Sequence, residues 1–179
     1  MKKILIVGGS GTIGSAFIKE FYDKYEFTSI SRNELNQAEL TIGISTDKAC
    51  FPENVYGYTK SLMEHCFHQA NNEINKFAVC RFANVANTTG SVIPFWLSQN
   101  KKNEPLKLTD KRMNRLMFSQ KSAVNLIHDT IMYCKKNGGG FTASKFMKSV
   151  NMYELAKNIS NKIKIVGLRP GERLNEKLM

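Results

Sequence analysis

Four side chains that can exchange protons lie within sixteen residues, 45–60. Tyr56 and Lys60 are four residues apart, so on a helix they would share one face. A lysine ammonium beside a phenol favours the phenolate and lowers a pKa that is otherwise about 10. A phenol tuned in this way can take a proton from a sugar hydroxyl. Asp47 and Lys48 would add an acid and a base on the facing loop.

A Tyr and a Lys at this spacing can also be a surface pair on an amphipathic helix, because Y-x-x-x-K alone has low specificity. The triplet Thr46-Asp47-Lys48 and Asn54, at their present spacing from Tyr56, favour the chemical interpretation. The segment S-T-D-K-A-x-x-P-x-N-x-Y-G-x-T-K resembles the active-site segment of extended short-chain dehydrogenases/reductases that act on nucleotide sugars. It is most similar to the soluble, inverting UDP-N-acetylglucosamine 4,6-dehydratases, which are polysaccharide biosynthesis proteins.

A glycine-rich loop near the start of the chain predicts a nucleotide site. The apolar run Ile4–Val7 predicts a buried parallel strand, and an apolar helical pattern begins at Ile13. The G-x-x-G-x-x-G loop between them allows the backbone to approach a pyrophosphate at the helix N-terminus. A plain tight turn is the alternative, which the strand–loop–helix context disfavours. The spacing is that of the extended short-chain family and implies cofactor contacts from Gly8, Gly11, Thr12, Ile13 and Gly14.

The end of the next predicted strand, 27–30, bears on the choice of cofactor. An acidic residue there would hold the ribose 2′-hydroxyl of NAD. This chain has Ser31 and Arg32 instead, and a hydroxyl with a guanidinium suits a 2′-phosphate. We therefore predict NADP rather than NAD, with an ordinary exposed arginine as the alternative. The resemblance adds Tyr56 and Lys60 to the cofactor contacts.

Between Arg32 and the segment 45–60, the chain is shorter than the family it resembles. Relatives carry two further strand–helix units here, which supply an acidic contact to adenine and a small-residue strand beside the nicotinamide, and they continue with a C-terminal tail. Ten residues, 31–40, are close to the minimum for a parallel crossover. Strand 41–45 could then lie directly against strand 4–7, with the missing strands closed out.

The rest of the chain alternates between helical and strand patterns. We predict helices at 55–72, 122–135 and 151–159, and strands at 76–82, 106–110, 141–143 and 163–166. The expected fold class is α/β: a reduced, mostly parallel Rossmann-type sheet with a small α/β substrate-binding part. Residues 1–86 would form the shortened NADP-binding part and 87–179 mainly the substrate-binding part, the two being interleaved.

The resemblance assigns five residues to the substrate. Asn84 lies where the family's chain enters the substrate site. Arg112 and Arg115 lie in a segment similar to R-M-T-R-F, and guanidinium groups match phosphate geometry, although alone they would be two solvated arginines. The R-P-G-E element, similar to the family's R-P-G-E-K-x-x-E, supplies Arg169 for the nucleotide diphosphate and Glu172 for uridine or for ordering the loop.

Composition argues against several classes of protein. The net charge of +11 comes from lysines spread along the chain without an arginine-rich run, which disfavours nucleic-acid binding. No apolar run approaches the ~18 residues of a membrane span, and the first is too short for a signal peptide. The four cysteines lack C-x-x-C spacing, and His65 and His68 lack supporting ligands. We therefore expect no metal and a reducing, cytoplasmic location.

The resemblance implies a role for each reactive group. NADP would take hydride from sugar C4 and later return it to C6, while Tyr56 removes the C4 hydroxyl proton. Lys60 would lower the pKa of Tyr56 and hold the nicotinamide ribose. Lys48 would remove the C5 proton, and Asp47 would protonate the departing C6 hydroxyl. Thr46 would hydrogen-bond the C4 oxygen.

The predicted function is a UDP-N-acetylglucosamine 4,6-dehydratase for surface-polysaccharide or nonulosonic-acid sugars, acting as a homo-oligomer. Two alternatives stay open. A nucleotide-sugar 4-epimerase would share the glycines, Tyr56 and Lys60, but it would have less use for Asp47 and Lys48. A catalytically silent, shortened copy that binds a nucleotide sugar or a partner is favoured by the missing strand–helix units.

Overall fold

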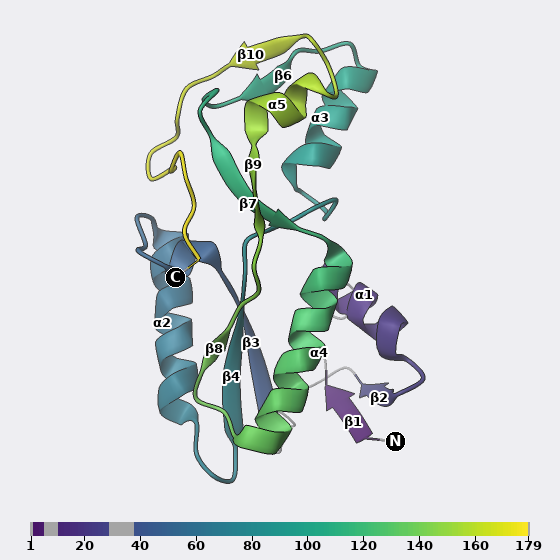
Figure 1. Ribbon diagram of the computed structural model, residues 1–179, viewed down its shortest axis with the longest axis vertical. Helices are drawn as coiled ribbons and strands as arrows, with labels where there is room; N and C mark the ends of the chain where they lie inside the picture. Colours follow the sequence, from purple (N-terminus) through teal and green to yellow (C-terminus); the bar gives the residue numbers. More distant parts are fainter. Residues whose placement is uncertain (1, 6–10, 29–37, 179) are drawn as a thin grey trace.

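The fold has a lower and an upper part in the view of Figure 1. The computed structural model describes residues 2–5, 11–28 and 38–178. The lower part is built on a parallel sheet whose strands, in spatial order, are β3 (Leu40–Thr46), β4 (Lys76–Phe82) and β8 (Thr142–Ala143).

Two long helices, α2 (Val55–Ala70) and α4 (Gln120–Asn137), cover the two faces of this sheet. Adjacent residues of β3 show which helix lies on which face, because successive side chains of a strand point in opposite directions. A Cβ added at Gly43 would meet the ring of Phe67 on α2, whereas Ile42 packs into the apolar cluster under α4. The end of β3 therefore lies between two helices.

The N-terminal unit forms a small sheet of its own. β1 (Lys2–Leu5) and β2 (Tyr25–Thr28) pair in parallel and are joined through α1 (Thr12–Phe21). α1 packs against α4. The apolar core between them contains Phe17, Phe21, Tyr25, Val124 and Ile131.

The arrangement of the first strand differs from our expectation. In the part of the chain that the structure describes, β1 pairs with β2 alone and β3 with β4 alone, so residues 4 and 5 are not paired with strand 41–45 as we expected. Residues 6 and 7 of the expected strand lie outside the described residues. Side chains join the two sheets instead, since Ile4 and Leu40 pack against the same cluster. Burial of this apolar surface under α1 and α4 holds both sheets without a backbone ladder between them.

The upper part is a layer of short strands and two helices. Its mixed sheet has the order β5 (Asn84–Val85), β7 (Asn114–Phe118) and β9 (Lys148–Asn151), with β7 and β9 antiparallel. A second, parallel pair is formed by β6 (Leu106–Leu108) and β10 (Ile163–Ile165). These strands pack with α3 (Val92–Lys101) and α5 (Met152–Lys157). The core contains Trp96, Leu106, Leu108, Met113, Met152 and Ala156.

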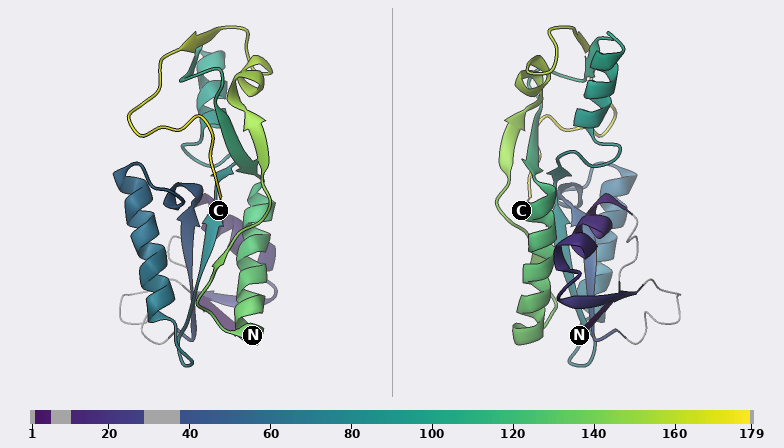
Figure 2. Two further views of the ribbon diagram at one scale, coloured as in Figure 1. Left: turned by 60° about the vertical axis from the view of Figure 1, so that its left-hand side comes forward. Right: turned by 90° about the vertical axis from the view of Figure 1, so that its right-hand side faces the viewer.

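The chain passes back and forth between the two parts (Figure 2). After β7 it returns to the lower sheet as α4 and β8, and β9 then leads upward again. The described pairings other than β7–β9 are parallel, which confirms the predicted α/β class with a mostly parallel sheet. The boundary proposed at residue 86 stays a prediction.

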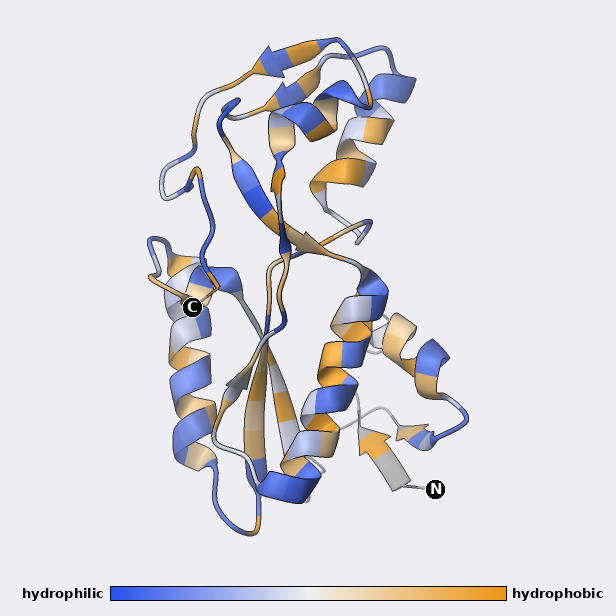
Figure 3. Ribbon diagram, viewed as in Figure 1, coloured by the Kyte–Doolittle hydropathy of each residue, from blue (hydrophilic) through white to orange (hydrophobic). Residues whose placement is uncertain are grey.

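Apolar residues follow this arrangement (Figure 3): they run along β3 and β4 and over parts of α1 and α4. Each of the helices in the described residues is too short or too polar to cross a membrane.

Candidate active site

The segment that carries Thr46, Asp47, Lys48, Tyr56 and Lys60 begins where β3 ends, at the carboxyl edge of the lower sheet. Thr46 closes the strand, the short 3₁₀ helix η2 (Asp47–Ala49) follows, and α2 starts at Val55. Asn54 caps α2, because its Oδ1 accepts a hydrogen bond of 2.9 Å from the amide of Gly57. A Cβ at Gly57 would lie 2.5 Å from the carbonyl oxygen of Lys48. The glycine thus lets the first turn of α2 pack directly on η2.

Thr46, Asp47 and Lys48 form one hydrogen-bonded network. The Thr46 hydroxyl donates to Asp47 Oδ1 at 2.8 Å, and Lys48 Nζ donates to the same oxygen at 3.1 Å. The Asp47 side chain is only 2% exposed, so these two donors compensate a buried charge. The acid and the base expected from the sequence are therefore in direct contact.

Tyr56 and Lys60 lie on the first turns of α2, beside this network. Lys60 Nζ donates to the backbone oxygen of Ile44 on β3 at 2.8 Å. Tyr56 is 53% exposed, and within the described ranges its hydroxyl has no hydrogen-bond partner. The phenol therefore has free access to a ligand, whereas the ammonium of Lys60 is bound to the strand.

A pocket of about 310 Å³ opens between η2 and the C-terminal segment, which we define as residues 166–178. Six of the predicted catalytic and substrate-binding residues line it, namely Asp47, Lys48, Asn84, Arg115, Arg169 and Glu172. Thr46, Tyr56, Lys60 and Arg112 are not in its lining. Arg112 is instead held by Asp110 through bonds of 3.0 and 2.8 Å, and these bonds lower the pKa of Asp110 to about 2.

Arg115 of β7 holds the C-terminal segment from the other side. Its guanidinium donates to the backbone oxygen of Arg173 at 2.8 Å and to Glu172 Oε1 at 3.2 Å. Its Nε lies 3.3 Å from Glu176 Oε1. Arg115 is thus placed at the pocket wall, where it binds protein groups on several sides.

Glu176 is the pocket residue that our sequence analysis missed. Its carboxylate meets Lys48 Nζ at 3.2 Å and accepts from Asn84 Nδ2 at 2.7 Å and from the Leu116 amide at 3.0 Å. The available signal was the R-P-G-E element itself, because Glu176 occupies the final glutamate position of R-P-G-E-K-x-x-E.

Charges in the pocket shift two pKa values. Burial alone would lower the pKa of Lys48, but the carboxylates of Glu176 and Asp47 outweigh burial and raise that pKa above 10.5. Burial raises the pKa of Glu176, and the charge of Asp47 adds to the effect, against the opposing attraction of Lys48 and Arg115. The resting site therefore holds Lys48 as an ammonium ion.

The C-terminal segment is attached to the lower part at several further points. Arg173 donates to the backbone oxygens of Cys50 and Phe51, and it pairs with Glu53 at 2.8 Å. Arg81 of β4 donates to the oxygen of Leu178 at 3.0 Å. One segment thus contacts η2, the loop before α2 and β4 below, and β7 above, and it closes the pocket between the two parts.

The predicted cofactor residues are only partly described. Gly8, Ser31 and Arg32 lie outside the described residues. Gly11 precedes α1 in an extended conformation and makes no side-chain cap hydrogen bond. Amide groups in the first turn of a helix can bind an anion. The Thr12 hydroxyl lies 3.1 Å from that of Thr89, in the loop after β5. Ile13 packs into the cluster under α4, near Gly14 in the first turn.

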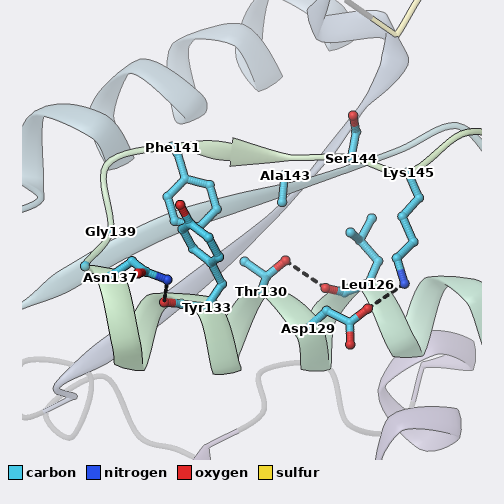
Figure 4. A pocket seen from close by; sticks show the side chains of 11 residues that line it. Leu126, Asp129, Thr130, Tyr133, Asn137, Gly139, Phe141, Ala143, Ser144 and Lys145 are labelled. Carbon is cyan, nitrogen blue, oxygen red and sulfur yellow. Dashed lines mark hydrogen bonds and ion pairs between the residues drawn. The ribbon is translucent and has the colours of Figure 1, made fainter.

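A second pocket, of about 520 Å³, lies between α4 and the chain around β8 (Figure 4). Leu126, Thr130 and Tyr133 point into it from the helix, and an ion pair between Lys145 and Asp129 closes one end. It contains none of the predicted site residues. Within the described residues, no group of three His, Cys, Asp or Glu side chains is placed to hold a metal ion.

Similarity to known proteins identifies the family of the chain. Residues 30–179 match the family model described as "Polysaccharide biosynthesis protein". A UDP-N-acetylglucosamine 4,6-dehydratase (inverting) of Campylobacter jejuni is 37% identical over 151 residues, which cover 79% of this chain and 43% of that protein. A UDP-glucose 4-epimerase of Rickettsia bellii is 32% identical over 153 residues, covering 81% of this chain and 45% of the relative.

The structural comparison shows the same fold. A Bacillus cereus UDP-glucuronic acid 4-epimerase, solved with UDP-glucuronic acid and NAD, superposes with a TM-score of 0.78 at 15% identity, covering 96% of this chain and 88% of that one. The chain spans less than half the length of the curated relatives it matches. Its fold is the Rossmann type of these enzymes, and the match over 150 of its 179 residues shows that the chain belongs to the polysaccharide biosynthesis protein family.

Proposed function

We propose that the chain acts on a UDP-linked sugar as a 4,6-dehydratase that uses a nicotinamide cofactor. The observation that carries the proposal is the Thr46–Asp47–Lys48 network, which opens at the carboxyl edge of the sheet into a pocket shared with Arg169. Ligands of open α/β sheets bind at this edge. An acid and a base in contact suit an elimination, in which one proton is removed and another is supplied.

The start of α1 fits the pyrophosphate of such a cofactor, because among the described residues no side chain caps the helix at Gly11. The cofactor would accept a hydride from sugar C4 and return it to C6. Lys60 lies on the same helix as Tyr56 and would leave the Ile44 oxygen to hold the nicotinamide ribose. We propose NADP over NAD because of Ser31 and Arg32.

The protein's own groups then divide the proton transfers. Tyr56 takes the proton of the C4 hydroxyl, and Thr46 hydrogen-bonds that oxygen. Lys48 takes the C5 proton, which the C4 ketone has made acidic, and Asp47 gives a proton to the departing C6 hydroxyl. Since Lys48 and Asp47 are 3.1 Å apart, a proton passing from the Lys48 ammonium to the Asp47 carboxylate would convert the resting ion pair into the amine and the acid that the elimination requires. Arg169 would bind the diphosphate, with Asn84 and Glu172 beside it.

The test is product formation. The whole chain is incubated with UDP-N-acetylglucosamine and NADP, and the sugar is followed by NMR. We expect a 4-keto-6-deoxy product that is lost in Tyr56→Phe and Lys48→Ala. Tyr58→Phe is the matched control, because Tyr58 is an exposed tyrosine on the same helix outside the pocket. A folded protein that binds UDP without any turnover would contradict the proposal.

Two other functions give different results in the same experiment. A 4-epimerase, the activity named for the Rickettsia relative, would give an epimeric sugar with its C6 oxygen retained. A silent binding module would give UDP binding alone, and the separation of β1 from β3 favours this outcome over the epimerase. Size measurement of the same sample tests the proposed homo-oligomer.

A further inference from the structure

Glu176 connects three residues that the sequence assigned to the reaction or to the substrate. Oε1 lies 3.2 Å from Lys48 Nζ and 3.3 Å from Arg115 Nε. Oε2 accepts hydrogen bonds from Asn84 Nδ2 at 2.7 Å and from the Leu116 amide at 3.0 Å. No single element supplies these donors: they come from η2, β5 and β7.

This set of contacts holds the carboxylate in one orientation. An ionised carboxylate accepts about four hydrogen bonds, and Glu176 has a donor for each. Its side chain is 5% exposed, so its contacts with Lys48 and Arg115 are not those of a mobile surface ion pair. A buried charge with this many partners is a fixed part of the pocket wall.

Lys48 is the partner on which Glu176 acts most directly. Its Nζ lies between Glu176 and Asp47, whose Oδ1 is 3.1 Å away. Two carboxylates favour the charged form of the amine. A lysine that is charged cannot accept a proton, so the base of the proposed reaction is blocked while both contacts persist.

We propose that Glu176 is a positioning residue for Lys48, which aims the amine into the pocket and holds it as an ammonium ion until this contact is broken. The inference rests on the proposed function, in which Lys48 takes the C5 proton. The charged groups facing the pair are Asp47 on η2 and Arg115 on β7, and Arg115 is in turn held by Glu172. Without the Glu176 contact, Lys48 would still contact Asp47, to which it can pass its proton.

The first experiment needs no turnover. The lysines of the whole chain, without substrate, are labelled with acetic anhydride at a series of pH values, and the Lys48 peptide is quantified by mass spectrometry. Glu176→Gln keeps the shape and removes the charge, so we expect the pKa of Lys48 to fall by about one unit or more, which is about tenfold faster labelling at a fixed lower pH.

Glu53→Gln is the matched control, because Glu53 also binds the C-terminal segment, through Arg173, without touching Lys48. We expect its Lys48 to titrate as in the wild type. If Glu176→Gln does not fold, the wild type still tests the proposal, because a Lys48 that titrates below its ordinary pKa would overturn it. Unchanged labelling in a folded Glu176→Gln protein overturns the positioning role.

A second experiment measures the acid limb of the pH–rate profile. If Lys48 is the base, Glu176→Gln moves this limb to lower pH by the same amount as the labelling, which a merely structural role would not do. If neither the wild type nor any variant turns over substrate, but Lys48 labelling shifts in Glu176→Gln, the proposed function is overturned and the effect of Glu176 on Lys48 is supported. Turnover with unchanged labelling overturns the inference and leaves the proposed function standing.

Discussion

The guanidinium of Arg115 is almost fully occupied by the protein itself. It binds two backbone oxygens and Glu172, and it faces Glu176. Arg169 lines the same pocket, and in the described part of the chain no residue bonds its guanidinium. We therefore propose that Arg169 is the main phosphate-binding residue among the three arginines that the sequence predicted for this role.

This difference predicts the effect of each arginine on UDP binding. Arg169→Ala should weaken binding about tenfold or more without lowering the melting temperature, because a hydrogen bond to a charged group contributes about 1.5–3 kcal/mol. Arg112→Ala should bind UDP as the wild type does, since its side chain is 73% exposed and paired with Asp110 outside the pocket. Calorimetric titration with UDP measures both, and equal losses in the two variants would contradict this assignment.

Helix α2 is fixed at its start by Asn54 and at its middle by a buried ion pair. Glu64 on α2 receives two hydrogen bonds from Arg81 of β4, one of them 3.0 Å long. Both side chains are mostly buried, at 8% and 16% exposure. Because Arg81 also binds Leu178, this pair joins the helix that carries Tyr56 to the C-terminal segment.

We expect Glu64→Ala to destabilise the fold strongly. It leaves Arg81 buried without its partner, which costs about 3–5 kcal/mol of unfolding free energy. Glu154→Ala removes a carboxylate from the exposed pair with Lys157 and should cost less than about 1 kcal/mol. Urea denaturation of the two variants provides the comparison. Similar midpoints would show that the buried pair stabilises the fold no more than the exposed pair does.

His128 lies between α1 and α4 and makes the stability of this packing depend on pH. Its ring stacks on Phe21 with centroids 4.3 Å apart, and its Nε2 lies 3.1 Å from the Tyr25 hydroxyl. Burial lowers the pKa of His128 below 6.5, with Lys24 and Lys135 acting in the same direction and Asp129 against them. The folded state therefore prefers the neutral ring.

The sign of the pH effect follows from this preference. As pH falls below 6.5, the unfolded chain binds a proton that the folded chain resists, so this contribution to stability is present above that pH and lost below it. Between pH 8 and pH 5.5, the urea midpoint should fall further in the wild type than in His128→Gln. Comparing the two proteins cancels the contributions of other titrating groups. If the urea midpoint depends on pH in the same way in both, His128 does not contribute to the pH dependence of stability.

Over the whole molecule, two sheets are joined by side chains and by α4. The unit β1–α1–β2 shares no backbone ladder with β3 in the described residues. Its attachment is the cluster around Phe17 and Phe21. Such a unit can open without breaking the sheet that carries the active-site segment.

Hydrogen exchange tests this separation. Amides of α1 should exchange faster than those of β4, which is paired on both sides, because opening the N-terminal unit requires loss of side-chain contacts alone. Equal protection of α1 and β4, measured by mass spectrometry on the whole chain, would show that the two sheets unfold as one.

The sequence predicted those features that local spacing determines. Helix α2 starts at Val55, where Asn54 and the helical pattern place it, and Asp47 and Lys48 lie at the end of β3 as expected. The strands β5, β7 and β9 were missed because pairing with one another defines them, and pairing depends on distant parts of the chain. Glu176 was missed for the same reason: it meets Lys48 across 128 residues.

That separation also has a consequence for how the site comes into existence. A ribosome adding 5–20 residues per second delivers Glu176 about 6–26 s after Lys48, so the acid–base pair is made well before the wall that covers it. During synthesis, Asp47 and Lys48 can already fold against α2 and β4 while their edge of the sheet is still open to water. The enclosed pocket is therefore a late product of biogenesis, formed when the C-terminal segment docks on both parts.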